Sequence, residues 1–273
     1  MENKLKILTN KTNKRRRIYP LNESFFDIID TEEKAYFLGF LYADGCNHIA
    51  KGCVSLSLQE KDKEILEKLS KLLQPSKPLH KYKNNTGFET KQSQYKLVIS
   101  SRHISEKLVS LGCMGAKTMI LKFPTEEQLP KKLHRHFIRG YFDGDGCVES
   151  NGASLMGTLD FCKYLKDLVK ENLKINFYLR LKKKYPTTEI CLKCKSARIF
   201  LKWIYNDSNI FLKRKYEKYI IQLKYEYSLK KLRKCCVKEC DTIQRSKNYC
   251  QYHYDQIRKN NKSYLLKNNI EWI

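Results

Sequence analysis

The chain has 273 residues, of which 41% are hydrophobic, enough for one large domain or two modest ones. Its 54 lysine and arginine residues outnumber 29 acidic ones, giving a formal net charge of +25 at pH 7. So large an excess predicts an acidic partner, and nucleic acid is the first candidate. A membrane surface is the alternative, but the sequence contains no long apolar run and no signal peptide.

The cysteine content indicates the kind of compartment in which the protein is found. Eleven cysteines without a secretory signal do not suggest a disulfide framework. We therefore expect a protein of the cytoplasm, in a bacterium or a phage-infected host, or of an organelle matrix.

Residues 1–20 are polar and include a basic run that ends at residue 17. The run is compatible with a solvated tail, with a localisation signal, or with a basic arm that lies along phosphate groups. In the last case Arg15, Arg16 and Arg17 are candidate DNA contacts.

One nine-residue pattern occurs twice, as FLGFLYADG at 37–45 and as IRGYFDGDG at 138–146. Each copy ends a predicted helix. A capping box at 30–33 starts the first helix and Pro130 stands near the start of the second. We expect Gly45 and Gly146 to end these helices in the left-handed conformation.

The glycines inside the two helices predict how the helices pack. Gly39 and Gly140 each cost about 1 kcal/mol against alanine, so a close approach of the two backbones is expected there. That packing would place Asp44 and Asp145 side by side at the helix ends, where the two carboxylates repel each other unless a cation lies between them. Hard oxygen ligands suit Mg²⁺, and two such ions can flank a scissile phosphate.

The remaining elements follow the same order in both halves. Hydrophobic periodicity and turn residues predict, in the first half, a strand at 47–58, a helix at 61–73, strands at 79–83 and 95–100, and a helix at 104–111. The second half predicts a helix at 131–143, a strand at 154–156, a helix at 160–173, strands at 177–182 and 189–193, and a helix at 197–205. The repeat predicts two pseudo-symmetric α+β units.

Each unit would supply an antiparallel sheet with one face under helices and one polar face free. The two free faces together would form a saddle for duplex DNA, with alternate strand residues entering the major groove. Each candidate for that surface is equally compatible with a solvated sheet face; they are Gln59, Lys81, Lys83, Lys96, Arg180, Lys182, Lys184 and Lys193.

The paired pattern resembles the LAGLIDADG motif of the homing endonuclease family in its monomeric two-motif form, over residues 20–225. Tyr42 stands where the motif has its first aspartate, and Arg139 where it has a small residue. The resemblance implies two αββαββα subdomains, here 21–128 and 129–228, in a monomer that cuts double-stranded DNA at one site and leaves short 3′ overhangs. It further implies a role in the homing of an intron or another mobile element.

The resemblance also implies site residues. Asp44 and Asp145 would hold Mg²⁺, next to Gly45 and Gly146. Lys195, before the last helix, would lie beside the scissile phosphates and polarise a water or stabilise charge, and Gln59 would be a polar residue supporting the site.

The last segment, 229–273, has the composition of a small metal-dependent module. Cys235, Cys240, Cys250 and His253 form a set of ligands that suits tetrahedral Zn²⁺, with Cys236 as an alternative to Cys235. So short a segment cannot bury a core of its own, so the metal would be structural. We expect it to contact DNA beside the core site through its basic residues, Lys238, Arg245, Lys247 and Arg258.

A protein of this fold that binds without cutting is the alternative function. It would be a transcription regulator, or a maturase that binds intron RNA. Both motif aspartates are present in the sequence, which favours the nuclease.

Overall fold

The computed structural model describes residues 18–74, 76–83, 93–115, 120–181, 187–229 and 234–267. The chain divides into two compact units, Met1–Tyr219 and Ile220–Ile273. The division falls inside a helix, nine residues before the boundary at 228/229 that we predict from the sequence. Within the described ranges, every helix is too short or too polar to cross a membrane.

The first unit contains the same succession of elements twice. The first repeat comprises α1 (Glu32–Asp44), β1 (Cys46–His48), β2 (Cys53–Gln59), α2 (Lys63–Leu73), β3 (His80–Lys83), β4 (Ser93–Ser100) and α3 (Arg102–Ser110). The second comprises α4 (His134–Asp145), β5 (Gly146–Glu149), β6 (Gly152–Gly157), α5 (Leu159–Leu173), β7 (Tyr178–Leu181), β8 (Thr188–Lys193) and α6 (Cys194–Tyr205). Helix α7 (Lys213–Leu229) follows, and α8 (Gln251–Lys267) belongs to the second unit. The predicted αββαββα order is confirmed.

Both repeats form a four-stranded antiparallel sheet with the same topology, β1-β2-β4-β3 and β5-β6-β8-β7. The registers are also equivalent, because the residue after each motif, Cys46 or Cys147, stands opposite a serine, Ser55 or Ser154. Strands β1 and β5 were not predicted as separate strands. They have only three and four residues, too few to show an alternating pattern, and their pairing with β2 and β6 defines them.

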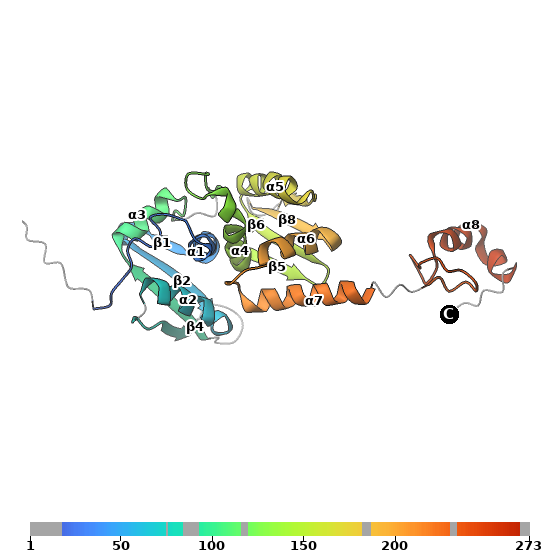
Figure 1. The fold of residues 1–273 in the computed structure, drawn as a ribbon, viewed down its shortest axis with the longest axis horizontal. Helices are drawn as coiled ribbons and strands as arrows, with labels where there is room; N and C mark the ends of the chain where they lie inside the picture. Colours follow the sequence, from blue (N-terminus) through green and yellow to red (C-terminus); the bar gives the residue numbers. More distant parts are fainter. Residues whose placement is uncertain are drawn as a thin grey trace, which may run out of the picture. The chain divides into compact units, whose positions relative to one another are not determined.

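The motif helices α1 and α4 lie side by side at the centre of the first unit, with one sheet on each side (Figure 1). A Cβ atom on Gly39 would lie 2.0 Å from the carbonyl oxygen of Phe137, and one on Gly140 would lie 1.9 Å from that of Tyr36. The two glycines therefore permit a backbone-to-backbone approach that any side chain would block. This is the packing that the sequence predicted.

The helix ends differ from the prediction in one respect. Gly45 and Gly146 have φ of −71° and −88°, in the extended region and not in the left-handed one. A Cβ atom on either residue would lie within 2.6 Å of a carbonyl oxygen of the last helical turn, on Leu41 or Phe142. Glycine is therefore required for space where the chain leaves the helix.

The two departures from the motif are explained by the core. Arg139 is fully buried and its guanidinium binds Glu32 of α1 at 2.5 Å and the carbonyl oxygens of Ile204 and Ile210. Tyr42 donates its hydroxyl hydrogen to the carbonyl of Leu111, just after α3. Each long side chain thus ties a motif helix to another part of the unit.

The residue equivalent to Tyr42 in the second motif, Asp143, has the matching role. Its carboxylate accepts hydrogen bonds from Tyr36 (2.9 Å), Tyr205 (2.6 Å) and the backbone N–H of Leu212, just before α7. Burial raises the pKa of Asp143, while these donors and Lys215 oppose the shift. The position therefore holds the segment after the last helix of each repeat.

Candidate active site and metal centres

Asp44 and Asp145 are the last residues of α1 and α4, and both side chains are exposed. A Cβ atom on Gly144 would lie 3.3 Å from Oδ2 of Asp44, so the Asp44 carboxylate lies against the turn of α4 that carries Asp145. Both carboxylates act on the same neighbours, Tyr141 and Lys215. The structure thus brings the two predicted carboxylates to one end of the helix pair.

The oxygen donors fit a hard divalent cation. Two exposed carboxylates at the negative ends of two adjacent helices concentrate negative charge where a cation and water have access. Mg²⁺ is commonly held by one or two carboxylates while it keeps several waters. Asp44 and Asp145 would be the residues that hold it.

Lys215, in the first turn of α7, is a site residue that the sequence analysis missed. Its ammonium donates to three carbonyl oxygens at the end of α4, those of Phe142 (2.8 Å), Asp143 (2.7 Å) and Gly144 (3.1 Å). The carbonyl of Phe142 also accepts from the backbone N–H of Gly146, and a cation is favoured at this end of a helix, where the last carbonyls lack intrahelical partners. Burial lowers the pKa of Lys215 to about 8, although Asp143 and both motif aspartates oppose the shift.

The only sequence signal for this residue is a basic run after an apolar pair, at 211–215. Such a run is indistinguishable from the start of a solvated linking helix. The distance to α4 along the chain is about 70 residues, so local patterns carry no information about the contact.

The structure does not bring Lys195 to the aspartates. In the second sheet Leu155 stands opposite Gly146, whereas Lys193 stands opposite Gly152 at the far end of the hairpin. Strand β8 therefore runs away from the motif, and Lys195 follows beyond its end. The register therefore gives no support to the predicted position of Lys195 beside the scissile phosphates, which stays a prediction.

Gln59, in the first sheet, differs from Lys195 because it lies at the end of its sheet that is near the motif. Cys46 stands opposite Ser55, so the last residues of β2 extend past the end of α1. Gln59 pairs with Gln94 of β4, and both belong to the face of the sheet away from the buried Leu56 and Leu97. Its predicted place at the motif end is compatible with this register.

Strand alternation separates the predicted DNA contacts of the first sheet. Lys96 is opposite His80 and Ser57, on the open face of the sheet. Lys81 and Lys83 alternate with His80 and therefore belong to the face that carries the buried Leu97 and Ile99. Lys81 there binds Glu60 at 2.8 Å. The prediction that these three lysines share one surface is wrong.

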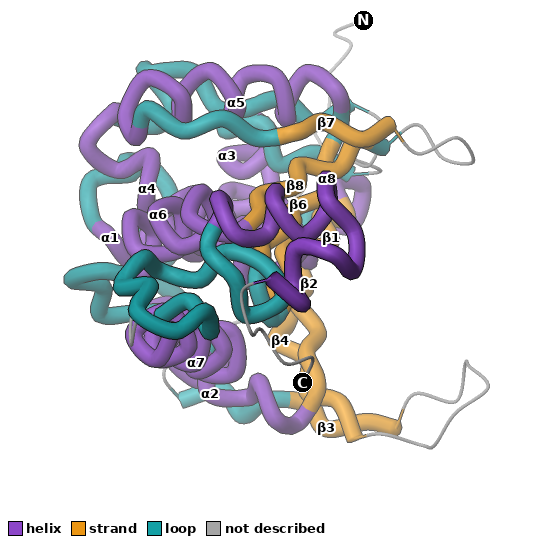
Figure 2. Tube along the Cα trace, turned by 90° about the vertical axis from the view of Figure 1, so that its right-hand side faces the viewer, coloured by secondary structure: helices purple, strands orange, loops and turns teal. Residues whose placement is uncertain are grey.

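In the second sheet Arg180 and Lys193 are on the open face, as predicted, and each pairs with a glutamate. Arg180 lies 3.3 Å from Glu189, and Lys193 lies 2.5 Å from Glu149. Figure 2 shows the strands of both sheets on one side of the first unit and α1, α2 and α4 on the other. The remaining basic candidates of this unit, Arg15, Arg16, Arg17, Lys182 and Lys184, lie outside the described residues.

The second unit brings together the predicted soft ligands. The ligand atoms of Cys235, Cys240, Cys250 and His253 all lie within 4.8 Å of one another. Nδ1 of His253 is 3.3 Å from two of the sulfurs, and the sulfurs of Cys240 and Cys250 are 3.9 Å apart. A tetrahedral zinc with bonds of about 2.3 Å to sulfur requires ligand separations of roughly 3.5 to 3.8 Å. The set fits Zn²⁺.

Cys236 is exposed and outside this cluster, so the structure decides the open choice in favour of Cys235. The four basic residues predicted to contact DNA, Lys238, Arg245, Lys247 and Arg258, are all exposed in the same unit.

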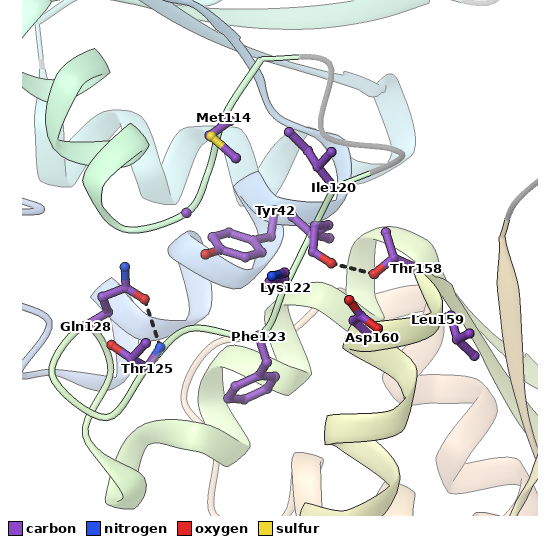
Figure 3. A pocket seen from close by; sticks show the side chains of 12 residues that line it. Tyr42, Met114, Ile120, Lys122, Phe123, Thr125, Gln128, Thr158, Leu159 and Asp160 are labelled. Atoms are coloured by element: carbon purple, nitrogen blue, oxygen red, sulfur yellow. Dashed lines mark hydrogen bonds between the residues drawn. The ribbon is translucent and has the colours of Figure 1, made fainter.

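Two cavities adjoin the motif end of the first unit. The smaller, of about 230 Å³, is lined by Asp145 together with Tyr141 and Thr187. The larger, of about 790 Å³, lies between α1, the segment 120–128 and the start of α5; Figure 3 shows Tyr42, Phe123 and Thr158 facing it. The motif aspartates do not line the larger cavity.

Comparison with known proteins gives similarity at the level of structure. Neither a protein-family model nor a curated protein matches the sequence. The chain resembles LAGLIDADG homing endonucleases in fold. The homing endonuclease I-WcaI, bound to its DNA recognition sequence, has a TM-score of 0.49 at 12% identity, covering 71% of this chain and 90% of that one.

Two further structures with this fold are similar to a comparable degree. The I-LtrWI LAGLIDADG homing endonuclease, bound to target DNA, has a TM-score of 0.47 at 12% identity, with 77% of this chain and 92% of that one covered. The N-terminal LAGLIDADG domain of DUF199/WhiA has a TM-score of 0.43 at 16% identity, with 69% of this chain and 89% of that one covered. Such likeness concerns the fold alone, so the function must be argued from the site.

Proposed function

We propose that the protein is a site-specific endonuclease that hydrolyses both strands of duplex DNA with the help of Mg²⁺. The observation that carries the proposal is the meeting of Asp44 and Asp145 at the adjoining ends of α1 and α4. The two carboxylates are exposed, and one of them belongs to each half of a duplicated unit. A duplicated centre of this kind is suited to two equivalent reactions, one on each strand.

The residues around the carboxylates have definable roles. Asp44 and Asp145 would hold the cation, which when bound acts as a Lewis acid toward phosphate and water. Lys215 neutralises the end of α4 by binding three of its carbonyls, and so holds the Asp145 turn in place. Gln59 extends past the first motif and would contact solvent or phosphate near Asp44.

The open sheet faces would bind the duplex. In the first sheet this face carries neutral polar groups, Gln59, Gln94 and Tyr82, with Lys96 and His80. In the second, Arg180 and Lys193 are balanced by glutamates. Arginine and amide side chains recognise guanine and adenine edges in the major groove, and glutamate can accept from cytosine. The excess positive charge of the whole chain supplies attraction to the phosphates.

The second unit would add a separate contact to DNA. We propose that Cys235, Cys240, Cys250 and His253 bind one structural Zn²⁺, since the four donors leave no open position for a substrate. Lys238, Arg245, Lys247 and Arg258 would then bind phosphates beside the core site, because all four are exposed on this small unit.

The first experiment is a selection of cleaved molecules from a randomised duplex library. Wild type, Asp44→Asn and Asp145→Asn would be compared with Mg²⁺ and with EDTA. We expect wild type to cut one long sequence in Mg²⁺ only, and both variants to lose double-strand cleavage while they still bind DNA. Tight binding by wild type without any cut would contradict the nuclease and favour a regulator or a maturase; binding to structured RNA would then separate those two.

A further inference from the structure

Tyr141 and Thr187 are among the hydroxyl-bearing residues that line the cavity beside Asp145, and they come from different parts of the chain. Tyr141 and Asp145 stand four residues apart on α4, on one face of the helix. Both line the cavity of about 230 Å³, together with Thr187 just before β8. A Cβ atom on Gly157 would lie 3.3 Å from the Tyr141 hydroxyl oxygen, so the position of that oxygen is closely defined.

The two hydroxyls differ in their bonding. Tyr141 donates to the carbonyl of Met156 at 2.9 Å, and the Asp145 carboxylate is a second hydrogen-bond partner of the same hydroxyl. The Thr187 hydroxyl oxygen is buried and has no hydrogen-bond partner among the described residues. Buried polar atoms normally find a partner, and a polar cavity of this size has room for water. The Asp145 carboxylate supplies a third polar group to the same space.

The first motif differs from the second at this point. Phe40 occupies the position of Tyr141, one turn before Asp44, and is also buried. The aromatic ring therefore fits in both halves, but only the second half carries the hydroxyl.

We propose that Tyr141 is a positioning residue for Asp145. Its hydroxyl contacts the Asp145 carboxylate directly, the Thr187 hydroxyl holds a water in the same cavity against that carboxylate, and the two contacts orient it toward the cation. The inference rests on the proposed function, because it concerns the same carboxylate. It adds that the two motif carboxylates are not equivalent and that the Asp145 side depends on hydroxyl groups that the Asp44 side lacks at the matching position.

The experiment compares Tyr141→Phe and Thr187→Val with wild type and with Tyr42→Phe as a control. Tyr42→Phe removes another buried hydroxyl-to-carbonyl hydrogen bond, from a residue that lines the same cavity but donates to Leu111. Each protein would be bound to a duplex recovered by selection for binding, so the measurement does not depend on cutting. Ca²⁺, a hard cation that takes oxygen ligands, would then be titrated by calorimetry.

We expect the Ca²⁺ affinity to fall roughly tenfold in Tyr141→Phe and in Thr187→Val, as is typical when a group that orients a metal ligand is removed. Tyr42→Phe should bind Ca²⁺ as wild type does. In Mg²⁺, the rate of cleavage of one labelled strand should fall more than that of the other. Identical Ca²⁺ titrations for all four proteins would overturn the inference, and so would an equal loss in Tyr42→Phe.

The Ca²⁺ titrations distinguish a failure of this inference from a failure of the proposed function. If wild type binds no Ca²⁺ and Asp145→Asn changes nothing, the cation centre itself is absent, and both proposals are wrong. If wild type binds Ca²⁺ through Asp145 but Tyr141→Phe has no effect, only the positioning role is wrong.

Discussion

Single residues inside the α1–α4 interface carry charge and are sensitive to pH. Nδ1 of His136 lies 3.0 Å from the Arg139 guanidinium. Burial, and then the charge of Arg139, lower the pKa of His136 from 6.5 to about 4, although Glu32 opposes the shift. At pH values between about 4 and 6.5, His136 is protonated in the unfolded chain and neutral in the folded one, so the unfolded chain binds more protons. The stabilising contribution is therefore complete above pH 6.5 and is lost as the pH falls toward 4.

We expect the free energy of unfolding to fall by roughly 2 to 3 kcal/mol through this one group between pH 7.5 and pH 4.5. Because other groups also titrate there, the measurement is the difference between wild type and His136→Gln in urea unfolding at the two pH values. The variant should lose less stability than wild type on acidification. Equal losses in the two proteins would show that His136 is protonated without cost in the folded state.

Helices α1 and α4 depend on two glycines for their separation. An alanine at Gly39 or Gly140 would put a Cβ atom about 2 Å from a carbonyl oxygen of the other helix, so the helices must move apart. We expect either substitution to cost about 1 to 3 kcal/mol or more. Cleavage should decline as well, because Asp44 and Asp145 are carried at the ends of these helices. Thermal unfolding and cleavage rates would measure both effects.

Lys71→Ala, on the exposed side of α2, is the matched control for these substitutions and should change stability by less than about 0.5 kcal/mol. A Gly140→Ala protein as stable as this control would mean that the two helices do not approach as described.

The molecule as a whole consists of two compact units that differ in what stabilises them. The first has a core formed by both repeats, whereas the second is small and brings three cysteines and a histidine together. Zinc-finger peptides obtain their folding free energy, about 10 to 16 kcal/mol, from metal binding. We therefore expect one bound zinc per chain, and its loss in Cys250→Ala, with weaker DNA binding but an unchanged main unfolding transition.

Cys236→Ala is the matched control, because Cys236 is adjacent to the cluster but outside it. It should keep one zinc per chain by elemental analysis. Zinc retained in Cys250→Ala, or lost in Cys236→Ala, would show that a different set of ligands binds the metal.

Much of this protein is predictable from local patterns. The start of α1 is correct to within one residue, because the N-cap is Thr31 and not Asp30 of the predicted capping box; the Thr31 side chain accepts a hydrogen bond from the backbone N–H of Lys34. Residues a few positions apart predict the helices, the repeat and the close contact at Gly39 and Gly140. Side chains share a face at a spacing of about 3.6 residues in a helix and 2 residues in a strand. The cluster of Cys235, Cys240, Cys250 and His253 was also identifiable, because cysteine and histidine at short spacing have few other uses.

Only the tertiary structure decided which distant residues reach the motif ends. The register of β8 takes Lys195 away from Asp145, and strand alternation puts Lys81 on the helical side of its sheet. The fold brings Lys215 to α4 across about 70 residues of sequence. Registers and such contacts depend on pairing between segments that are far apart in the chain, and periodicity within one segment does not encode them. The sequence alone therefore determined the helices and the paired carboxylates, while the packing of the two repeats decided what surrounds them.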